Sequence, residues 1–369
     1  MKKILFLVNH DVVIYNFRYE LVEALRNEGH EVIISSPYGE RIGDLKSIGC
    51  RYIETNVSRH GTNPIKDFSL FLTYLKILKK EKPDIVFSYT IKPNIYGGMA
   101  CELMGIPYVA NITGLGSAVE NGGIMQMFTV FLYKLAFAKV QKVFFQNTEN
   151  RQFFIDKKIA LKKHGLLPGS GVNLEKFSYM EYHESDKTEF AFISRIMKEK
   201  GADQYLEAAA RIKEKYPNTV FHVCGFCEEA YEERLTQLQE KGIVVYHGMV
   251  RDVRNVIKDM HCIIHPTYYP EGLSNVLLEA SACGRPIITT NRSGCREVID
   301  DGINGFIIEQ KNAKDLTEKI ERFLALSYEE KKEMGIAGRK KVEKEFDRQI
   351  VVDKYMEELG EKQKEKVMV

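Results

Sequence analysis

Short apolar runs alternate with longer segments of mixed polarity along the whole chain. In the first half, the runs KILFLVN, EVIISS, RYIET, DIVFS, PYVAN and KVFFQ have the length and composition of buried strands. The segments between them repeat their apolar residues with helical period, around Tyr15–Asn27, Lys66–Lys80, Asn94–Met104 and Ile124–Lys139. This alternation predicts a parallel sheet with helices on both faces.

The same pattern restarts in the second half of the chain. Pro168, Gly169 and Gly171, with the polar segment SYMEYHESDKTE after them, predict an interdomain linker. The runs EFAFIS, TVFHVCG, IVVYHG, HCIIHP, RPIITT and GFIIE then predict a second sheet, with helices that begin near Ala202, Glu228, Val253, Asn275 and Glu297. We therefore expect an α/β fold of two Rossmann-like, doubly wound domains, residues 1–168 and 184–345, that face each other across a cleft.

Composition narrows the class of protein. The chain has 53 basic and 51 acidic residues, so its net charge is close to zero and gives no overall electrostatic field that would attract nucleic acid. Its seven cysteines lie scattered in apolar runs, as reduced core residues do, and the single CxxC of Cys224 and Cys227 predicts no metal site. The apolar run Ile4–Val8 is too short for a signal peptide, and no stretch of eighteen apolar residues occurs. We expect a cytoplasmic protein, soluble or peripheral to a membrane, without a cofactor.

The strongest chemical signal lies between His265 and Phe306. A loop carries Glu271, Ser274 is suited to cap a helix from Asn275, and Glu279 lies about one turn inside that helix. The amide groups at such a helix start favour a phosphate, and flanking carboxylates can accept hydrogen bonds from sugar hydroxyls. A sugar and a ribose joined by a diphosphate present this arrangement, although an isolated pair of glutamates is also typical of solvated surface charge.

A pair of cations strengthens the interpretation. The first strand of the second half leads into SRIMKEKG, which places Arg195 and Lys200 on one loop and lets the chain turn at Gly201. Two cations at the carboxyl edge of a strand can bind a leaving diphosphate. Gly225 follows the next strand, where a close approach of the backbone is expected.

In this order, the elements SRIMKEKG, VCG, HGMVRDV, HPTYYPEGLSNVLLEA, GRPIITT and SGCREVIDDGINGF resemble retaining glycosyltransferases of family 4, which have the GT-B fold. The resemblance implies that Arg195 and Lys200 hold the donor diphosphate in place of a metal ion, that Glu271 contacts the transferred sugar, and that Glu279 binds the ribose. It also implies further donor contacts from Gly225, Gly272, Leu273, Ser274 and Asn275.

The first half resembles a narrower group. SYTIKPNIYGG and NITGLGSA are similar to enzymes that build polysaccharide repeats or lipid-linked oligosaccharides, including N-acetylhexosaminyltransferases. The chain departs from the wider family where Thr113 and Gly114 replace a histidine, and where HDVVIYNFR replaces a glycine-rich loop. Polar residues after the strands of this half are candidate acceptor contacts: His60, Lys92, Asn94, Thr113 and Asn16.

Two further features bear on the acceptor and the fold. Residues 124–140 are almost entirely apolar, which is typical either of a helix buried in its domain or of one that faces a membrane. A last helix near 348–360 packs back on the first domain, as the resemblance implies.

The predicted function is transfer of a hexose or N-acetylhexosamine from a UDP-sugar to a sugar hydroxyl of an acceptor linked to polyprenyl diphosphate, at the inner face of the membrane. Two alternatives stay open, a UDP-sugar 2-epimerase of the same fold and a non-catalytic nucleotide-sugar-binding protein.

Overall fold

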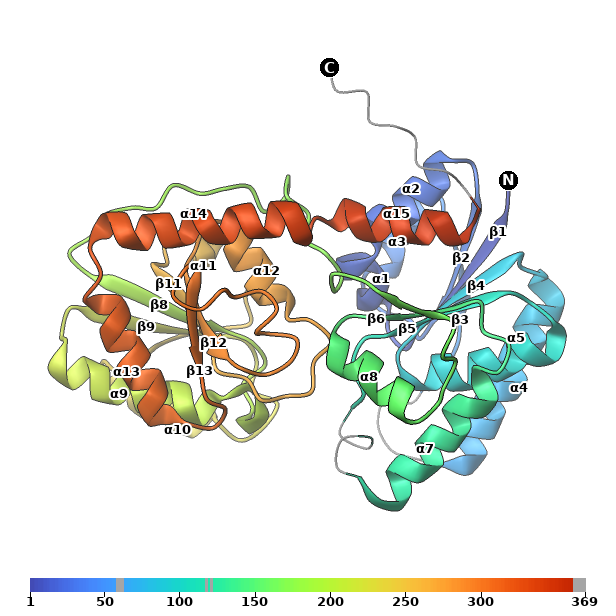
Figure 1. The fold of residues 1–369 in the computed structure, drawn as a ribbon, viewed down its shortest axis with the longest axis horizontal. Helices are drawn as coiled ribbons and strands as arrows, with labels where there is room; N and C mark the ends of the chain where they lie inside the picture. The colour runs from blue at the N-terminus through green and yellow to red at the C-terminus, as the bar shows by residue number, and fades with distance from the viewer. Residues whose placement is uncertain (58–62, 117–118, 120–121, 361–369) are drawn as a thin grey trace. The chain divides into compact units, whose positions relative to one another are not determined.

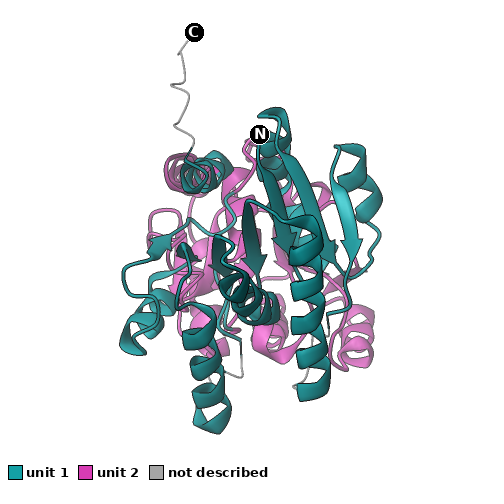
Figure 2. Ribbon diagram, turned by 90° about the vertical axis from the view of Figure 1, so that its right-hand side faces the viewer, with its two compact units in different colours: residues 1–171, 270–273, 348–369 teal, residues 172–269, 274–347 magenta. Residues whose placement is uncertain are grey.

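The computed structural model describes residues 1–57, 63–116, 119 and 122–360. The chain forms two compact units (Figure 2). Unit 1 comprises Met1–Gly171, Pro270–Leu273 and Arg348–Val369, and unit 2 comprises Val172–Tyr269 and Ser274–Asp347. The short loop Pro270–Leu273, expected in the second domain, therefore belongs by its contacts to unit 1.

Unit 1 is built on a seven-stranded sheet in the order β3-β2-β1-β4-β5-β6-β7 (Figure 1), and all neighbouring strands are parallel. The strands are β1 (Lys3–Leu7), β2 (Glu31–Ser36), β3 (Arg51–Glu54), β4 (Ile85–Tyr89), β5 (Tyr108–Ile112), β6 (Lys142–Phe145) and β7 (His164–Leu166). Parallel strands covered on both faces need an apolar side chain at nearly every position, as the central strands β1, β4 and β5 have.

The helices of unit 1 cover both faces of this sheet. They are α1 (Asp11–Phe17), α2 (Tyr19–Asn27), α3 (Ile42–Ser47), α4 (Pro64–Glu81), the π-helical turn η1 (Pro93–Gly97), α5 (Gly98–Met104), α7 (Gly123–Ala136), α8 (Thr148–Asp156) and α15 (Arg348–Glu358). Successive residues of a strand point to opposite faces. Leu5 and Leu7 accordingly pack with α4, α5 and α7, while Ile4 and Phe6 pack with α2 and α15.

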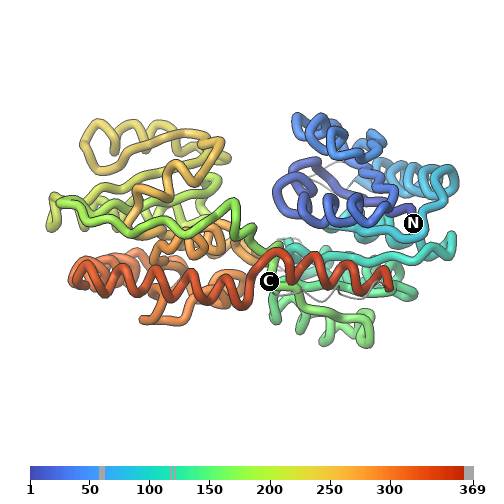
Figure 3. Tube along the Cα trace, turned by 90° about the horizontal axis from the view of Figure 1, so that it is seen from above, coloured from blue at the N-terminus to red at the C-terminus, as the bar shows by residue number. Residues whose placement is uncertain are grey.

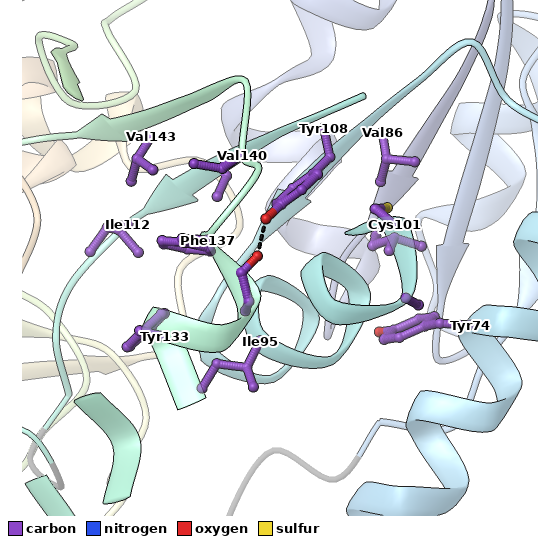
Figure 4. Packing of buried hydrophobic residues seen from close by; sticks show 14 of the residues in the cluster. Tyr74, Val86, Ile95, Cys101, Tyr108, Ile112, Tyr133, Phe137, Val140 and Val143 are labelled. Atoms are coloured by element: carbon purple, nitrogen blue, oxygen red, sulfur yellow. Dashed lines mark hydrogen bonds between the residues drawn. The ribbon is translucent and has the colours of Figure 1, made fainter. Parts of the chain in front are cut away.

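The first of these two cores contains a buried polar anchor (Figure 4). The hydroxyl of Tyr108 donates a hydrogen bond to the carbonyl oxygen of Ala136, where α7 ends. Tyr133 and Phe137 pack beside this bond. Burying an aromatic ring together with a satisfied hydroxyl stabilises the seam between β5 and α7.

Helix α15 brings the end of the chain back beside α2 (Figures 1 and 3). Tyr355 is buried, with its ring centroid 5.0 Å from Phe87 and 5.2 Å from Phe144. The buried guanidinium of Arg18 lies 5.8 Å from the Tyr355 ring and 5.2 Å from Tyr89, in cation–π geometry. α15 is therefore part of the second core of unit 1.

Unit 2 repeats the architecture with a six-stranded parallel sheet in the order β10-β9-β8-β11-β12-β13. Its strands are β8 (Thr188–Ile193), β9 (Thr219–Cys224), β10 (Val245–Gly248), β11 (Cys262–His265), β12 (Ile287–Thr290) and β13 (Gly305–Ile308). Its helices are the 3-10 turn η2 (Lys198–Lys200), α9 (Ala202–Lys215), α10 (Glu232–Glu240), α11 (Arg254–Ile257), α12 (Asn275–Ala282), α13 (Ala313–Leu324) and α14 (Tyr328–Glu345).

The sequence pattern was wrong at two helices. The helix expected at Tyr15–Asn27 is split at Arg18, whose backbone angles of −140° and 12° end α1 and begin α2. A helix expected from Glu297 is also absent: residues 293–298 form turns, in which the Glu297 carboxylate accepts hydrogen bonds from the amide of Gly294 and the hydroxyl of Ser293.

Each sheet reverses its strand order at one point. The reversal falls between β1 and β4 in unit 1 and between β8 and β11 in unit 2. In open α/β sheets, ligands bind outside the carboxyl ends of the strands at this switch point. The loops after these four strands are therefore the first place to look for a site.

Candidate nucleotide-sugar site

In unit 2, the switch point brings together the loop after β8 and the loop after β11. The amide of Tyr268 donates to the carbonyl oxygen of Glu199 over 2.9 Å, and the hydroxyl of Thr267 donates to the same oxygen over 3.3 Å. Gly201, with φ of +81°, lies so close to the Pro266 carbonyl that a Cβ there would overlap it. The two loops are thus fixed against each other.

The two predicted cations converge on one aromatic ring. The guanidinium carbon of Arg195 lies 5.4 Å from the ring centroid of Tyr269, and the ammonium of Lys200 lies 4.8 Å from it. Lys200 is buried and Arg195 is partly exposed. The structure therefore places both cations at the carboxyl edge of the sheet, where they can neutralise one dianionic group together.

A carboxylate on the loop after the neighbouring strand, β9, holds the Arg195 side chain. Its guanidinium donates to the carboxylate of Glu228, on the loop after β9. Burial opposes the charge on Arg195, but Glu228 and Tyr269 outweigh it, so the pKa of the guanidinium is raised. Gly225, with φ of +143°, lets this loop approach, since a Cβ at that position would overlap the carbonyl oxygen of Ser194. The close backbone approach expected at Gly225 is therefore an approach to Ser194, the residue before Arg195.

Helix α12 begins where the sequence predicted, but it is capped differently. Ser274 is the N-cap residue and makes no side-chain capping bond; its hydroxyl lies 3.2 Å from Nε2 of His265 instead. The first-turn amides of α12 consequently receive no bond from the N-cap side chain, which suits an anion. The buried Oδ1 of Asn275 has no hydrogen-bond partner in the described part of the chain. Glu279 lies in the middle of α12, half-buried.

The loop Pro270–Leu273 is anchored in unit 1. The side-chain amide of Asn147 donates to the carbonyl oxygens of Glu271 and Gly272, over 3.1 and 2.6 Å. A Cβ at Gly272 would lie 2.5 Å from the carbonyl oxygen of Thr113, so only glycine fits there. Thr113, a predicted acceptor contact, therefore lies beside the backbone next to Glu271, and Leu273 is buried in the same loop.

The remaining first-half candidates lie at separate places in unit 1. The Lys92 ammonium is paired with the Asp67 carboxylate over 2.8 Å. Asn94 is buried, accepts from the Ser88 hydroxyl and donates to the Asn111 carbonyl oxygen, so its side chain is occupied. Asn16 is exposed on α1. His60 lies outside the described residues.

Sequence reasoning missed several residues around the site. Asn147 caps α8 and follows β6 directly, so its place at a strand end was the available signal. Tyr269 and Glu228 gave no local signal, because their roles depend on contacts between separate loops. Thr90, directly after β4, has φ of +68° and a buried hydroxyl without a partner among the described residues. A β-branched residue in this conformation is strained, and such strain clusters at functional sites.

Comparison with known proteins identifies the class. Residues 177–341 match the family model of glycosyl transferases group 1, and residues 3–147 match that of glycosyl transferase 4-like domains. These two matches and the two parallel α/β units described above agree. The chain belongs to the family 4 glycosyltransferases, which have the GT-B fold, and it is a transferase enzyme.

Particular relatives are similar over nearly the whole chain. An N,N'-diacetylbacillosaminyl-diphospho-undecaprenol α-1,3-N-acetylgalactosaminyltransferase of Campylobacter jejuni is 29% identical over 95% of this chain and 96% of its own length. The capsular polysaccharide biosynthesis glycosyltransferase CapM of Staphylococcus aureus is 27% identical, covering 89% of this chain and 90% of its own. Because both relatives are glycosyltransferases, the UDP-sugar 2-epimerase alternative is not favoured.

Solved structures share the fold. A glycosyltransferase from Rickettsia africae superposes with a TM-score of 0.78 at 21% identity, over 97% of this chain and 98% of that one. Anabaena HepE, solved in complex with UDP and glucose, superposes with a TM-score of 0.80 at 15% identity, over 98% and 100%.

Helix α7 presents one buried and one exposed face. Thr129, Tyr133 and Ala136 are buried, whereas Met127 and Phe131 are 72% and 55% exposed. One face of α7 is therefore buried in its own unit, as the first of the two sequence interpretations expected, and the opposite face is exposed. Within the described ranges, no helix combines the length and apolar character needed to cross a bilayer.

Proposed function

We propose that the enzyme transfers a hexose or N-acetylhexosamine from a UDP-sugar to a sugar hydroxyl of an acceptor linked to polyprenyl diphosphate. The observation that carries the donor half is the convergence of Arg195 and Lys200 on Tyr269 at the switch point of unit 2. The acceptor half is supported by the Campylobacter relative and by an Escherichia coli relative named UDP-Gal:α-D-GlcNAc-diphosphoundecaprenol α-1,3-galactosyltransferase, 28% identical over 66% of this chain and 67% of its own length.

Each part of the donor has a partner in this proposal. Arg195, Lys200 and the first-turn amides of α12 bind the diphosphate, Glu279 accepts hydrogen bonds from the ribose hydroxyls, and Glu271 contacts the transferred sugar. The bond from the sugar C1 to the diphosphate oxygen breaks as the bond to the acceptor oxygen forms on the same face. The acceptor proton passes to the leaving diphosphate, so UDP departs and the anomeric configuration is retained. The two cations stabilise the growing negative charge without a metal ion.

The proposal is tested by incubating the enzyme with a panel of UDP-sugars and a GlcNAc-diphosphate-polyprenol acceptor, with and without EDTA. We expect UDP release that depends on the acceptor, persists in EDTA, and yields an α-linked product by NMR. Hydrolysis alone, or transfer with inversion, would contradict the mechanism.

Glu279→Ala is expected to raise the dissociation constant of UDP. Loss of hydrogen bonds to a charged group costs about 1.5–3 kcal/mol, which corresponds to a roughly 10- to 100-fold weaker affinity. Isothermal titration calorimetry measures this directly. Glu240→Ala, an exposed glutamate at the end of α10 in the same unit, is the matched control and should bind UDP as the parent does. Equal affinity of the Glu279 variant and the parent would remove Glu279 from the ribose site.

We further propose that the exposed face of α7 contacts the cytoplasmic surface of a membrane. Ile124, Met127 and Phe131 are 87%, 72% and 55% exposed, and Lys134 and Lys139 lie exposed towards the end of the same segment. An apolar face bordered by lysines suits the boundary between acyl chains and anionic headgroups.

Replacing both Met127 and Phe131 by Ser is expected to lower the vesicle partition coefficient at least tenfold, because each side chain contributes about 1.5–3 kcal/mol when fully buried. Co-sedimentation with phosphatidylglycerol-containing vesicles gives the readout. Tyr38→Ser changes an equally exposed aromatic residue elsewhere in unit 1 and should have no effect. Unchanged sedimentation of the double variant would exclude α7 as the contact.

A further inference from the structure

Unit 1 contains an apolar cavity of about 410 Å³, bounded by α4, η1, α5 and α7. Its walls are mainly hydrocarbon and aromatic, with Phe71, Ile91, Ile95, Met99, Phe128 and Leu132 among them. The volume lies within the range of roughly 300–1,000 Å³ that is typical of pockets for small ligands. The proposed sugar-binding roles leave this cavity without a function.

The cavity begins at the edge of the sheet where the acceptor is expected. Ile91 and Lys92, two and three residues after β4, line it at the switch point of unit 1. The loop after β5, which carries Thr113, approaches the same lining, since a Cβ at Gly116 would lie 3.1 Å from Cδ1 of Ile91. The cavity therefore lies beside the strand ends that carry acceptor candidates.

The polar groups in the cavity wall largely satisfy one another. The ammonium of Lys92 and the hydroxyl of Tyr96 both donate to the Asp67 carboxylate, over 2.8 and 3.3 Å. A peptide inserted here would bury backbone amides with few partners, which is costly. A hydrocarbon chain has no such requirement. The wall chemistry thus favours a lipid chain over a protein segment.

The rim of the cavity is apolar as well. Phe68 and Phe128 line it while remaining 61% and 52% exposed, and both belong to helices with further exposed apolar residues. Contiguous exposed apolar surface on a soluble fold marks an interaction site. A chain that leaves the cavity past these rings would stay in apolar surroundings on the exposed face of α7.

We propose that this cavity binds the isoprene units nearest the diphosphate of the lipid-linked acceptor. The inference rests on the proposed function, because only a lipid-linked acceptor brings a hydrocarbon chain to the end of β4. A phospholipid acyl chain would satisfy the walls equally, but it has no reason to lie at the acceptor edge of the sheet. The cavity would then bind the lipid part of the acceptor independently of its sugars.

Binding can be measured without activity, since the chain contains no tryptophan. Phe71→Trp places a single indole in the cavity wall, and titration with farnesyl diphosphate should give a saturable blue shift of its emission. Inorganic diphosphate and a short-chain phosphatidylglycerol should neither cause nor compete with the shift. Tyr38→Trp, outside the cavity, should not respond. If the Phe71 variant fails to fold, Phe128→Trp at the rim reports the same event. No shift in either cavity variant, or full competition by phosphatidylglycerol, would overturn the proposal.

A cavity-filling variant tests the consequence for catalysis. Leu132→Phe should raise KM about tenfold for a GlcNAc-diphosphate-polyprenol acceptor, while KM for the same sugar diphosphate carrying a methyl group, and kcat for both, stay unchanged. Leu103→Phe, an exposed leucine of α5 outside the cavity, is the control. An equal change in KM for both acceptors, or no change for either, would contradict the inference. The inference would also fail if analytical ultracentrifugation showed a dimer of the parent that Leu132→Phe dissociates and Leu103→Phe does not, because the cavity would then be occupied by a second copy of the chain. If the parent enzyme uses neither acceptor, the proposed function fails, and the fluorescence titration still decides the cavity.

Discussion

Arg195→Ala is expected to lower kcat by about 10²–10³, the usual effect of removing one preorganised donor from a developing negative charge. The guanidinium is held by Glu228 and lies over Tyr269, so it is already in place before the diphosphate leaves. KM for the donor should change much less than kcat, because the interaction grows as charge accumulates on the leaving group. Initial-rate kinetics with the cognate UDP-sugar separate the two constants.

The control for this variant is Arg211→Ala. Arg211 is 51% exposed and pairs with Glu207 at 2.5 Å towards the far end of α9 in the same unit, so its loss removes an exposed, paired cation away from the loop that carries Arg195. Its kcat should equal that of the parent. A turnover of Arg195→Ala within threefold of the parent would take Arg195 out of the mechanism.

Gly225→Ala is expected to reduce the free energy of unfolding by about 3 kcal/mol, combining backbone strain at positive φ with overpacking, each about 1–3 kcal/mol. The added methyl group would overlap the Ser194 carbonyl oxygen, which is backbone and can move only with the loop that carries Arg195. Activity should therefore fall even at temperatures where the variant is folded. Urea unfolding and kcat measured on the same preparation check both effects.

Gly242→Ala provides the comparison. Gly242 also has positive φ, +67°, but nothing lies within 4 Å of a Cβ built there. Its replacement should cost only about 1–2 kcal/mol of backbone strain and leave kcat intact. If the two alanine variants lost equal stability and kept equal activity, close approach at Gly225 would not be what positions Arg195.

The fold followed from the sequence because both sheets are parallel and buried. The central strands, such as β1, β4 and β5, are then short apolar runs, and the repeated alternation leaves little choice of architecture. Local errors arose where the backbone departs from what the apolar pattern predicts, as at Arg18, whose backbone angles split the helix expected at Tyr15–Asn27 into α1 and α2.

The candidate site was predictable only in part. Arg195, Lys200 and the start of α12 lie at strand ends, which the sequence order reveals. The convergence of Arg195 and Lys200 on Tyr269 depends on loops far apart in the chain, as does the anchoring of residues 270–273 by Asn147, and no local pattern encodes either. The pairing of Lys92 with Asp67 likewise joins two segments distant in sequence, and no local pattern indicated it.

The most direct test of the proposed donor site is a crystal structure of the enzyme with UDP. We expect the diphosphate within hydrogen-bond distance of the side chains of Arg195 and Lys200 and of the first-turn amides of α12, with the ribose hydroxyls on Glu279. UDP bound away from these residues would contradict the central claim.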